Sequence, residues 1–110
     1  MPLSERARIS VYIPHQPADE HEKLLAILQA EFTETFGGST IMRGLQGSYR
    51  AVDGSDCLES ICLIYTFTPL PIREHFVEIE KYVAQMRQAF LDALGEEVVL
   101  VVVESAFFAP

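Results

Sequence analysis

Apolar and polar residues alternate strictly over residues 7–13. The apolar positions are Ala7, Ile9, Val11 and Ile13, and the intervening positions are Arg8, Ser10 and Tyr12. Successive side chains of a strand point to opposite faces, so this pattern predicts a half-buried β-strand. Pro14 ends the pattern.

The next apolar residues recur every three or four positions, which is the period of an amphipathic helix. They are Leu24, Leu25, Leu28, Phe32 and Phe36. We expect Pro17 in the first turn, followed by carboxylates at the positive end of the helix dipole. The predicted helix ends at Gly37 and Gly38, because glycine readily adopts the left-handed conformation of a C-terminal cap.

Two strands follow, joined by the turn sequence VDGSD at residues 52–56. The first, residues 39–51, is interrupted by Gly44 and Gly47, which we expect to mark a bulge or a close approach. The second, residues 58–68, is apolar on both faces after Ser60.

A second amphipathic helix is predicted from a stripe of apolar residues with steps of four and three. The stripe comprises Ile72, Phe76, Ile79, Val83, Met86, Phe90 and Ala93. At this length it is typical of a core face rather than of a coiled coil. Gly95 supplies the stop, residues 98–103 form a last strand, and residues 104–110 form a tail.

The predicted order is β-α-β-β-α-β. Two βαβ-type halves joined by a hairpin give the ferredoxin-like α+β fold, a four-stranded antiparallel sheet with two helices on one face. The length of 110 residues is that of one domain, so we assign residues 1–110 to it, with 1–6 and 105–110 as terminal extensions.

The face without helices should be polar in a monomer. Instead, Ile61, Leu63, Tyr65 and Phe67 share one side of the third strand, and the last strand has no polar side. We therefore predict a homodimer or higher oligomer that pairs through the open sheet face or through the edge of the last strand. Phe107 and Phe108 of the tail would lie across the partner or fold back over their own sheet.

The net charge of −8 opposes binding to nucleic acid. The longest apolar run, residues 98–103, is far shorter than the ~20 residues that span a bilayer. Cys57 and Cys62 are five positions apart, so on one strand they point to opposite faces and cannot pair. We read them as free thiols in a reducing, cytoplasmic compartment; a metal or redox role is the less favoured reading.

Candidate chemistry is sparse. Gly37 and Gly38 follow a helix, whose carbonyl end repels phosphate, so they are not expected to form a phosphate-binding loop. His15, His21 and His75 lack the spacing of a metal site, and no cofactor is expected. The segment RGLQGSYR, residues 43–50, places two arginines beside glycines and a tyrosine; they are either solvated edge residues or part of a site for an anion or polar ligand.

The helix that ends in FGG-x-T, the GSY segment, the hairpin into an apolar strand and the final valine-rich strand together resemble small bacterial proteins of uncharacterised ferredoxin-like families. The resemblance covers about residues 7–104 and implies no established activity. The chain is also broadly similar to dimeric α/β-barrel proteins. That group pairs through sheet faces and includes cofactor-free oxygenases and small-molecule sensors, so the fold alone does not fix the function.

Two functions are consistent with the sequence. The first is a homo-oligomeric module, without catalysis, that binds a small ligand or a protein. The second is a small cofactor-free enzyme of the dimeric α/β-barrel type that acts on an aromatic or carboxylate-bearing molecule. The residues predicted to contact such a ligand are Tyr12, Arg43, Tyr49, Arg50 and Tyr65.

Overall fold

The computed structural model describes residues 3–14, 18–94 and 100–109. Within these ranges the chain forms four strands and two helices in the order β-α-β-β-α-β. Their bounds are β1 Ser4–Pro14, α1 Ala18–Phe36, β2 Thr40–Arg50, β3 Asp56–Phe67, α2 Ile72–Leu94 and β4 Leu100–Phe108.

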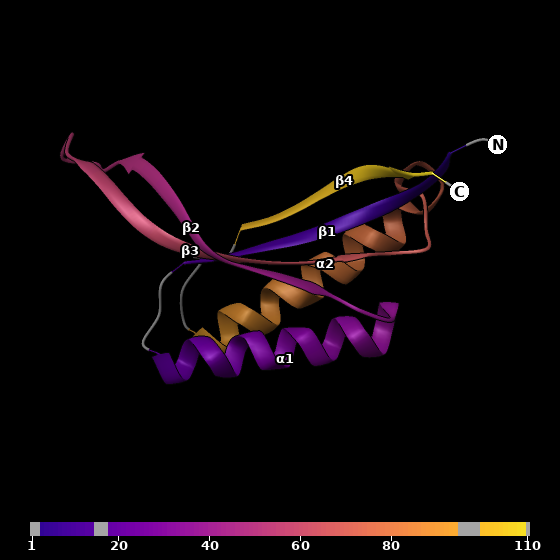
Figure 1. Ribbon diagram of the computed structural model, residues 1–110, viewed down its shortest axis with the longest axis horizontal. Helices are drawn as coiled ribbons and strands as arrows, with labels where there is room; N and C mark the ends of the chain where they lie inside the picture. Colours follow the sequence, from indigo (N-terminus) through magenta and orange to yellow (C-terminus); the bar gives the residue numbers. More distant parts are fainter. Residues whose placement is uncertain (1–2, 15–17, 95–99, 110) are drawn as a thin grey trace.

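The four strands form one antiparallel sheet with the order β2-β3-β1-β4. Both helices lie on the same face of this sheet, and the other face is open (Figure 1). The predicted ferredoxin-like fold is therefore confirmed. β1 lies inside the sheet between β3 and β4, whereas β2 and β4 are its edges.

The alternation in β1 decides where the core lies. Ala7, Ile9, Val11 and Ile13 are fully buried on the helix side. Helix α1 contributes its apolar stripe to the same core, and α2 contributes Ile79, Met86 and Phe90. Burying a large apolar side chain contributes about 1.5–3 kcal/mol, so this layer is the main source of stability.

Glycines mark the irregular backbone positions as predicted. Gly37 ends α1 with a φ of 91°, and its N–H donates to the carbonyl of Thr33 over 2.9 Å. Gly44 has a φ of 75° at the point where the β2–β3 register shifts, between Met42 and Leu45, which confirms a bulge. At Gly47 the approach is close, because a Cβ there would lie 2.5 Å from Cδ1 of Ile61.

Three details of the prediction need correction. The first and last strands of the chain are longer than expected: β1 begins at Ser4, and β4 continues to Phe108, so most of the predicted tail is strand. This extension follows from the pairing of Ser4 with Phe108. Phe76, predicted as core, is 58% exposed because it lies toward the β4 edge. The predictions for Pro17, Gly95 and residues 98–99 lie outside the described residues.

The β2–β3 hairpin extends past the ends of both helices, at the left of Figure 1. The molecule is accordingly elongated, with extents of 50 × 27 × 25 Å. The tip of the hairpin turns at Gly54, whose φ is 88°. One part of the sheet is thus backed by helices and another part projects from the body.

Candidate functional site: the open face of the sheet

The face of the sheet opposite the helices is largely apolar. The strand register places directly opposed residues on one face, for example Tyr12 opposite Leu63 and Leu100. The large hydrophobic side chains that this register assigns to the open face are Tyr12, Met42, Leu45, Tyr49, Ile61, Leu63, Tyr65, Phe67, Leu100, Val102 and Phe108. Large apolar patches on the surfaces of soluble proteins are typical of interaction sites.

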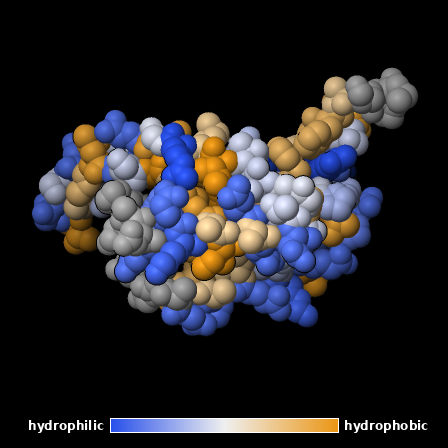
Figure 2. Space-filling model, turned by 60° about the horizontal axis from the view of Figure 1, so that its bottom comes forward, coloured by the Kyte–Doolittle hydropathy of each residue, from blue (hydrophilic) through white to orange (hydrophobic). Residues whose placement is uncertain are grey.

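The charges on the open face nearly cancel. Its charged side chains are Arg6, Arg8, Glu59 and Glu104. Arg8 donates to the Glu104 carboxylate and lies over the ring of Tyr65, 5.3 Å from its centroid. In contrast, the two helices carry nine acidic and four basic residues. Figure 2 shows that side of the molecule, where hydrophilic residues predominate.

Aromatic rings form a chain along one end of the open face. Phe67 contacts Tyr65 with a centroid separation of 5.6 Å and Phe108 with one of 4.8 Å, both in edge-to-face geometry. The Arg6 guanidinium lies 4.8 Å from the Phe108 ring centroid. Edge-to-face and cation–π contacts of this kind fix the orientations of the rings, so the aromatic surface at this end of the face has a defined shape.

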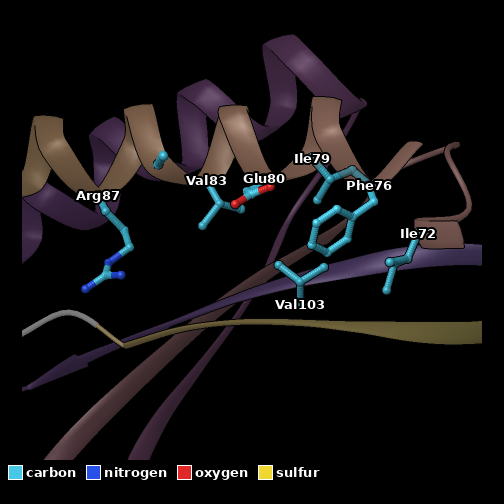
Figure 3. A pocket seen from close by; sticks show the side chains of 8 residues that line it. Ile72, Phe76, Ile79, Glu80, Val83, Arg87 and Val103 are labelled. Carbon is cyan, nitrogen blue, oxygen red and sulfur yellow. The ribbon is translucent and has the colours of Figure 1, made fainter. Parts of the chain in front are cut away.

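A groove of about 360 Å³ runs between α2 and the β4 edge (Figure 3). Its walls are mostly apolar: Ile72, Phe76, Ile79 and Val83 of α2 face Val103 of β4. Glu80 and Arg87 add one charge of each sign, and Arg87 lies at the opposite end from Ile72. The groove lies beside the β4 edge of the sheet, which no other strand of the described ranges covers. Its lining residues include no pair of side chains suited to acid–base chemistry.

A second cavity, of about 280 Å³, lies where α1 ends and β2 begins. It is lined by Arg6, Phe36, Gly37, Gly38, Ser39, Thr40, Tyr65, Thr66 and Phe67. The sequence prediction assigns no role to Arg6, Ser39 or Thr40. Arg6 falls in a predicted terminal extension, and only the pairing of β1 with its neighbours brings it to this cavity. Of the five residues predicted to contact a ligand, only Tyr65 lines this cavity.

The structure places the two predicted arginines away from this cavity. Arg43 donates to Glu22 of α1, with Nη1 2.8 Å from Oε1. This hydrogen bond and the charge of Arg43 lower the pKa of Glu22, and Glu22 in turn raises the pKa of Arg43. Arg50 donates to Asp56 over 3.3 Å near the hairpin tip.

The three predicted tyrosines all lie on the open face, but at different places. Tyr65 lines the cavity at the end of α1. Tyr12 lies opposite Leu63 in the middle of the sheet. Tyr49 is 55% exposed on the projecting hairpin, where the charge and hydrogen bonding of Cys57 raise its pKa. The structure therefore does not gather the five predicted residues in one pocket, and their binding role stays a prediction.

Among the remaining titratable groups, the Tyr82 hydroxyl of α2 donates to Glu31 Oε1 of α1 over 3.0 Å. Cys57 and Cys62 are unpaired, and burial raises the pKa of the Cys62 thiol. Over the described ranges, no three His, Cys, Asp or Glu side chains are grouped so as to hold a metal ion. His75 Nδ1 lies 3.0 Å from Glu78 one turn further along α2, a contact within one helix.

Comparisons with known protein families, with curated proteins and with solved structures find no match to this chain. Neither described helix combines the length and hydrophobicity needed to cross a membrane. The open face and its cavities are the structural features from which a function can be inferred.

Proposed function

We propose that this protein is a homodimeric binding module in which two copies pack through the open faces of their sheets. The observation that supports it is the array of eleven large hydrophobic side chains on a face that no helix covers. Leaving such a face in water forgoes about 25 cal/mol per Å² of apolar surface, so a partner that covers it gains stability.

The size of the open face suits a stable dimer. Four strands spaced about 4.8 Å apart, each about ten residues long at about 3.4 Å per residue, span roughly 600–700 Å². Stable interfaces bury about 800 Å² per partner. The face is thus close to the expected size before contacts from its rim are added.

Charge favours a second copy of this chain as the occupant. Two molecules that each carry a net charge of −8 repel each other least when they meet through a surface without excess negative charge. The open face has two basic and two acidic side chains, and Arg8 already neutralises Glu104. The helix side, with its excess of carboxylates, would instead bring like charges together.

The second candidate function is the small cofactor-free enzyme. It rests on the prediction that tyrosines and arginines together orient an aromatic or carboxylate substrate. We rank it below the binding module because Arg43 and Arg50 each already pair with a carboxylate on the side away from Tyr65.

Light scattering coupled to size-exclusion chromatography tests the dimer. The wild-type chain should have twice the monomer mass at micromolar concentration. Met42→Lys should raise the dissociation constant at least about a hundredfold, because it puts an unpaired ammonium group into an apolar interface. Met42 is 44% exposed on the open face, so the substituted monomer should still fold.

Val77→Lys is the matched control. Val77 is 74% exposed on α2, and this substitution changes the net charge by the same amount without touching the open face. It should leave the dimer intact. A monomeric wild type would overturn the proposal, and a Met42→Lys variant that dimerises like the wild type would move the interface to the β4 edge.

A further inference from the structure

We propose that the cavity between the end of α1 and the start of β2 binds a small carboxylate with an apolar, preferably aromatic, body. This inference deepens the proposed binding module and rests on it for the view that the protein binds ligands. The cavity exists because β2 pairs with β3 only from Thr40 opposite Tyr65 onward. Thr66 and Phe67 have no neighbour on β2, and the gap beside them is the cavity.

Arg6 is the charged group of the cavity. The lining contains no Asp or Glu, so its charge is positive within a chain of net charge −8. Among the arginines of the strands, Arg8, Arg43 and Arg50 each pair with a carboxylate. Arg6 has no such partner within the described ranges; its guanidinium instead lies over the Phe108 ring. Stacking leaves the N–H edges of a guanidinium available to a carboxylate.

Ser39 supplies a second donor. Its hydroxyl oxygen is buried and has no hydrogen-bond partner among the described residues. Buried polar atoms are usually paired, so an unpaired hydroxyl on a cavity wall points to a bound group that accepts a hydrogen bond. Thr40 adjoins it on the same wall.

The end of α1 would repel an anion if its carbonyl groups faced the cavity unpaired. Two of the nearby carbonyl groups are already occupied. The carbonyl of Thr33 accepts the Gly37 N–H at 2.9 Å, and that of Gly38 accepts the Thr66 hydroxyl at 2.6 Å. The positive charge of Arg6 opposes the negative potential of the helix end, and the lining contains no carboxylate, so an anion is the preferred ligand.

Part of the remaining wall is aromatic. Phe36, Tyr65 and Phe67 line the cavity, and the contact between Tyr65 and Phe67 holds both rings. The volume of about 280 Å³ is at the lower end of the range for small-molecule pockets, which begins at about 300 Å³. A single ring bearing one carboxylate therefore matches the cavity in size and charge.

Calorimetry and amide NMR with benzoate as the probe test this site in the full-length wild-type chain. We expect a dissociation constant on the order of 1 mM or tighter, with the largest shifts at the amides of Gly37, Gly38 and Ser39. Benzamide, which has the same shape without the charge, should bind at least about tenfold more weakly. Benzylamine should not bind, because the cavity already carries a positive charge.

Arg6→Gln should weaken benzoate binding at least about tenfold, and Arg6→Lys should recover part of the loss. The matched control is Arg50→Gln, which removes a strand arginine of the same charge at the hairpin tip and should leave binding unchanged. The proposal of a carboxylate site would be overturned by equal binding of benzamide and benzoate, by no binding of benzoate, or by undiminished binding of benzoate to Arg6→Gln. Light scattering on the same samples separates the proposals: a dimer that binds no benzoate refutes only the cavity, and a monomer that binds it refutes only the dimer.

Discussion

The β2–β3 hairpin has two segments that differ in how far their side chains are buried. In the helix-backed segment, residues 62–67 of β3 with 40–42 of β2, side chains such as Cys62 and Ile64 are buried beneath α1 and α2. In the projecting segment, residues 56–61 with 45–50, side chains are half-buried or exposed on both faces. In both segments the side chains of β2 and β3 alternate between the two faces of the sheet, so strand pairing alone does not decide which of them are buried.

Element length explains the difference. The 12 residues of β3 extend about 40 Å at about 3.4 Å per residue, whereas the 19 residues of α1 extend about 28 Å at about 1.5 Å per residue. A helix of this length cannot back the whole strand. An isolated two-stranded hairpin is marginally stable in water, so the projecting segment depends on its connection to the body or on a partner chain.

The two cysteines give the largest contrast, because one lies in each segment. Cys62 is 4% exposed under the helices, and Cys57 is partly exposed on the projecting segment. Modification of Cys62 requires global unfolding, whereas Cys57 reacts after local opening. We expect alkylation of Cys57 to be faster by about a thousandfold or more, measured by mass spectrometry of the native protein over time. Similar rates would mean that the body opens as easily as the projecting segment.

Truncation of a side chain should show the second-largest contrast. Ile64→Ala removes a fully buried side chain and should lower the free energy of unfolding by about 2–4 kcal/mol. Leu58→Ala, at a position 70% exposed on the projecting segment, should change it by less than about 0.5 kcal/mol. Urea denaturation measures both. A large loss in Leu58→Ala would show that something packs against the projecting segment in solution.

A smaller effect is expected within the projecting segment. Gly47→Ala would place a Cβ 2.5 Å from Cδ1 of Ile61, the mobile end of its side chain, so we expect a loss of about 1 kcal/mol. Ile61→Val removes that atom. If the contact is the cause, Gly47→Ala should cost little in the Ile61→Val background, and urea denaturation of the double-mutant cycle measures the coupling. An equal cost in both backgrounds would assign the effect to the backbone.

The smallest effect concerns the ion pair at the boundary between the segments. Arg43 lowers the pKa of Glu22, so their contact stabilises the fold above the ordinary pKa of glutamate and is lost as the pH falls through the lowered value. Arg43→Gln should return the Glu22 pKa toward its ordinary range. NMR of the Glu22 side-chain carboxyl group during an acid titration measures this pKa. The pair is exposed, so the unfolding midpoint at neutral pH should not move measurably. An unchanged Glu22 pKa would show that the contact does not persist in solution.

The fold could be predicted from the sequence because β1 and both helices have a clear period and turn residues separate the other strands. The alternation in β1 and the helix cap at Gly37 were both predictable from the local sequence. The bulge at Gly44 was predictable in the same way, because a glycine inside a strand pattern often marks the place where an extra residue interrupts the pairing.

The cavity was not predictable from local patterns. Arg6 and Ser39 are 33 positions apart, and no local pattern connects them. Their meeting depends on the β1–β3 register and on where β2 begins to pair, both of which are set by the packed sheet. The exposure of Phe76 has a similar origin: the helical period predicts which residues share a stripe, but the placement of α2 against β4 decides how much of the stripe is covered.

The position of β1 between β3 and β4 has a consequence for how the chain folds. Arg8 and Glu104, which meet across β1 and β4, are 96 positions apart, so a very long loop must close before the last strand can dock. Loop closure of this kind slows folding, and until it occurs one edge of β1 has no hydrogen-bonding neighbour. A three-stranded intermediate with that edge free would be the species most prone to pair with other molecules during refolding.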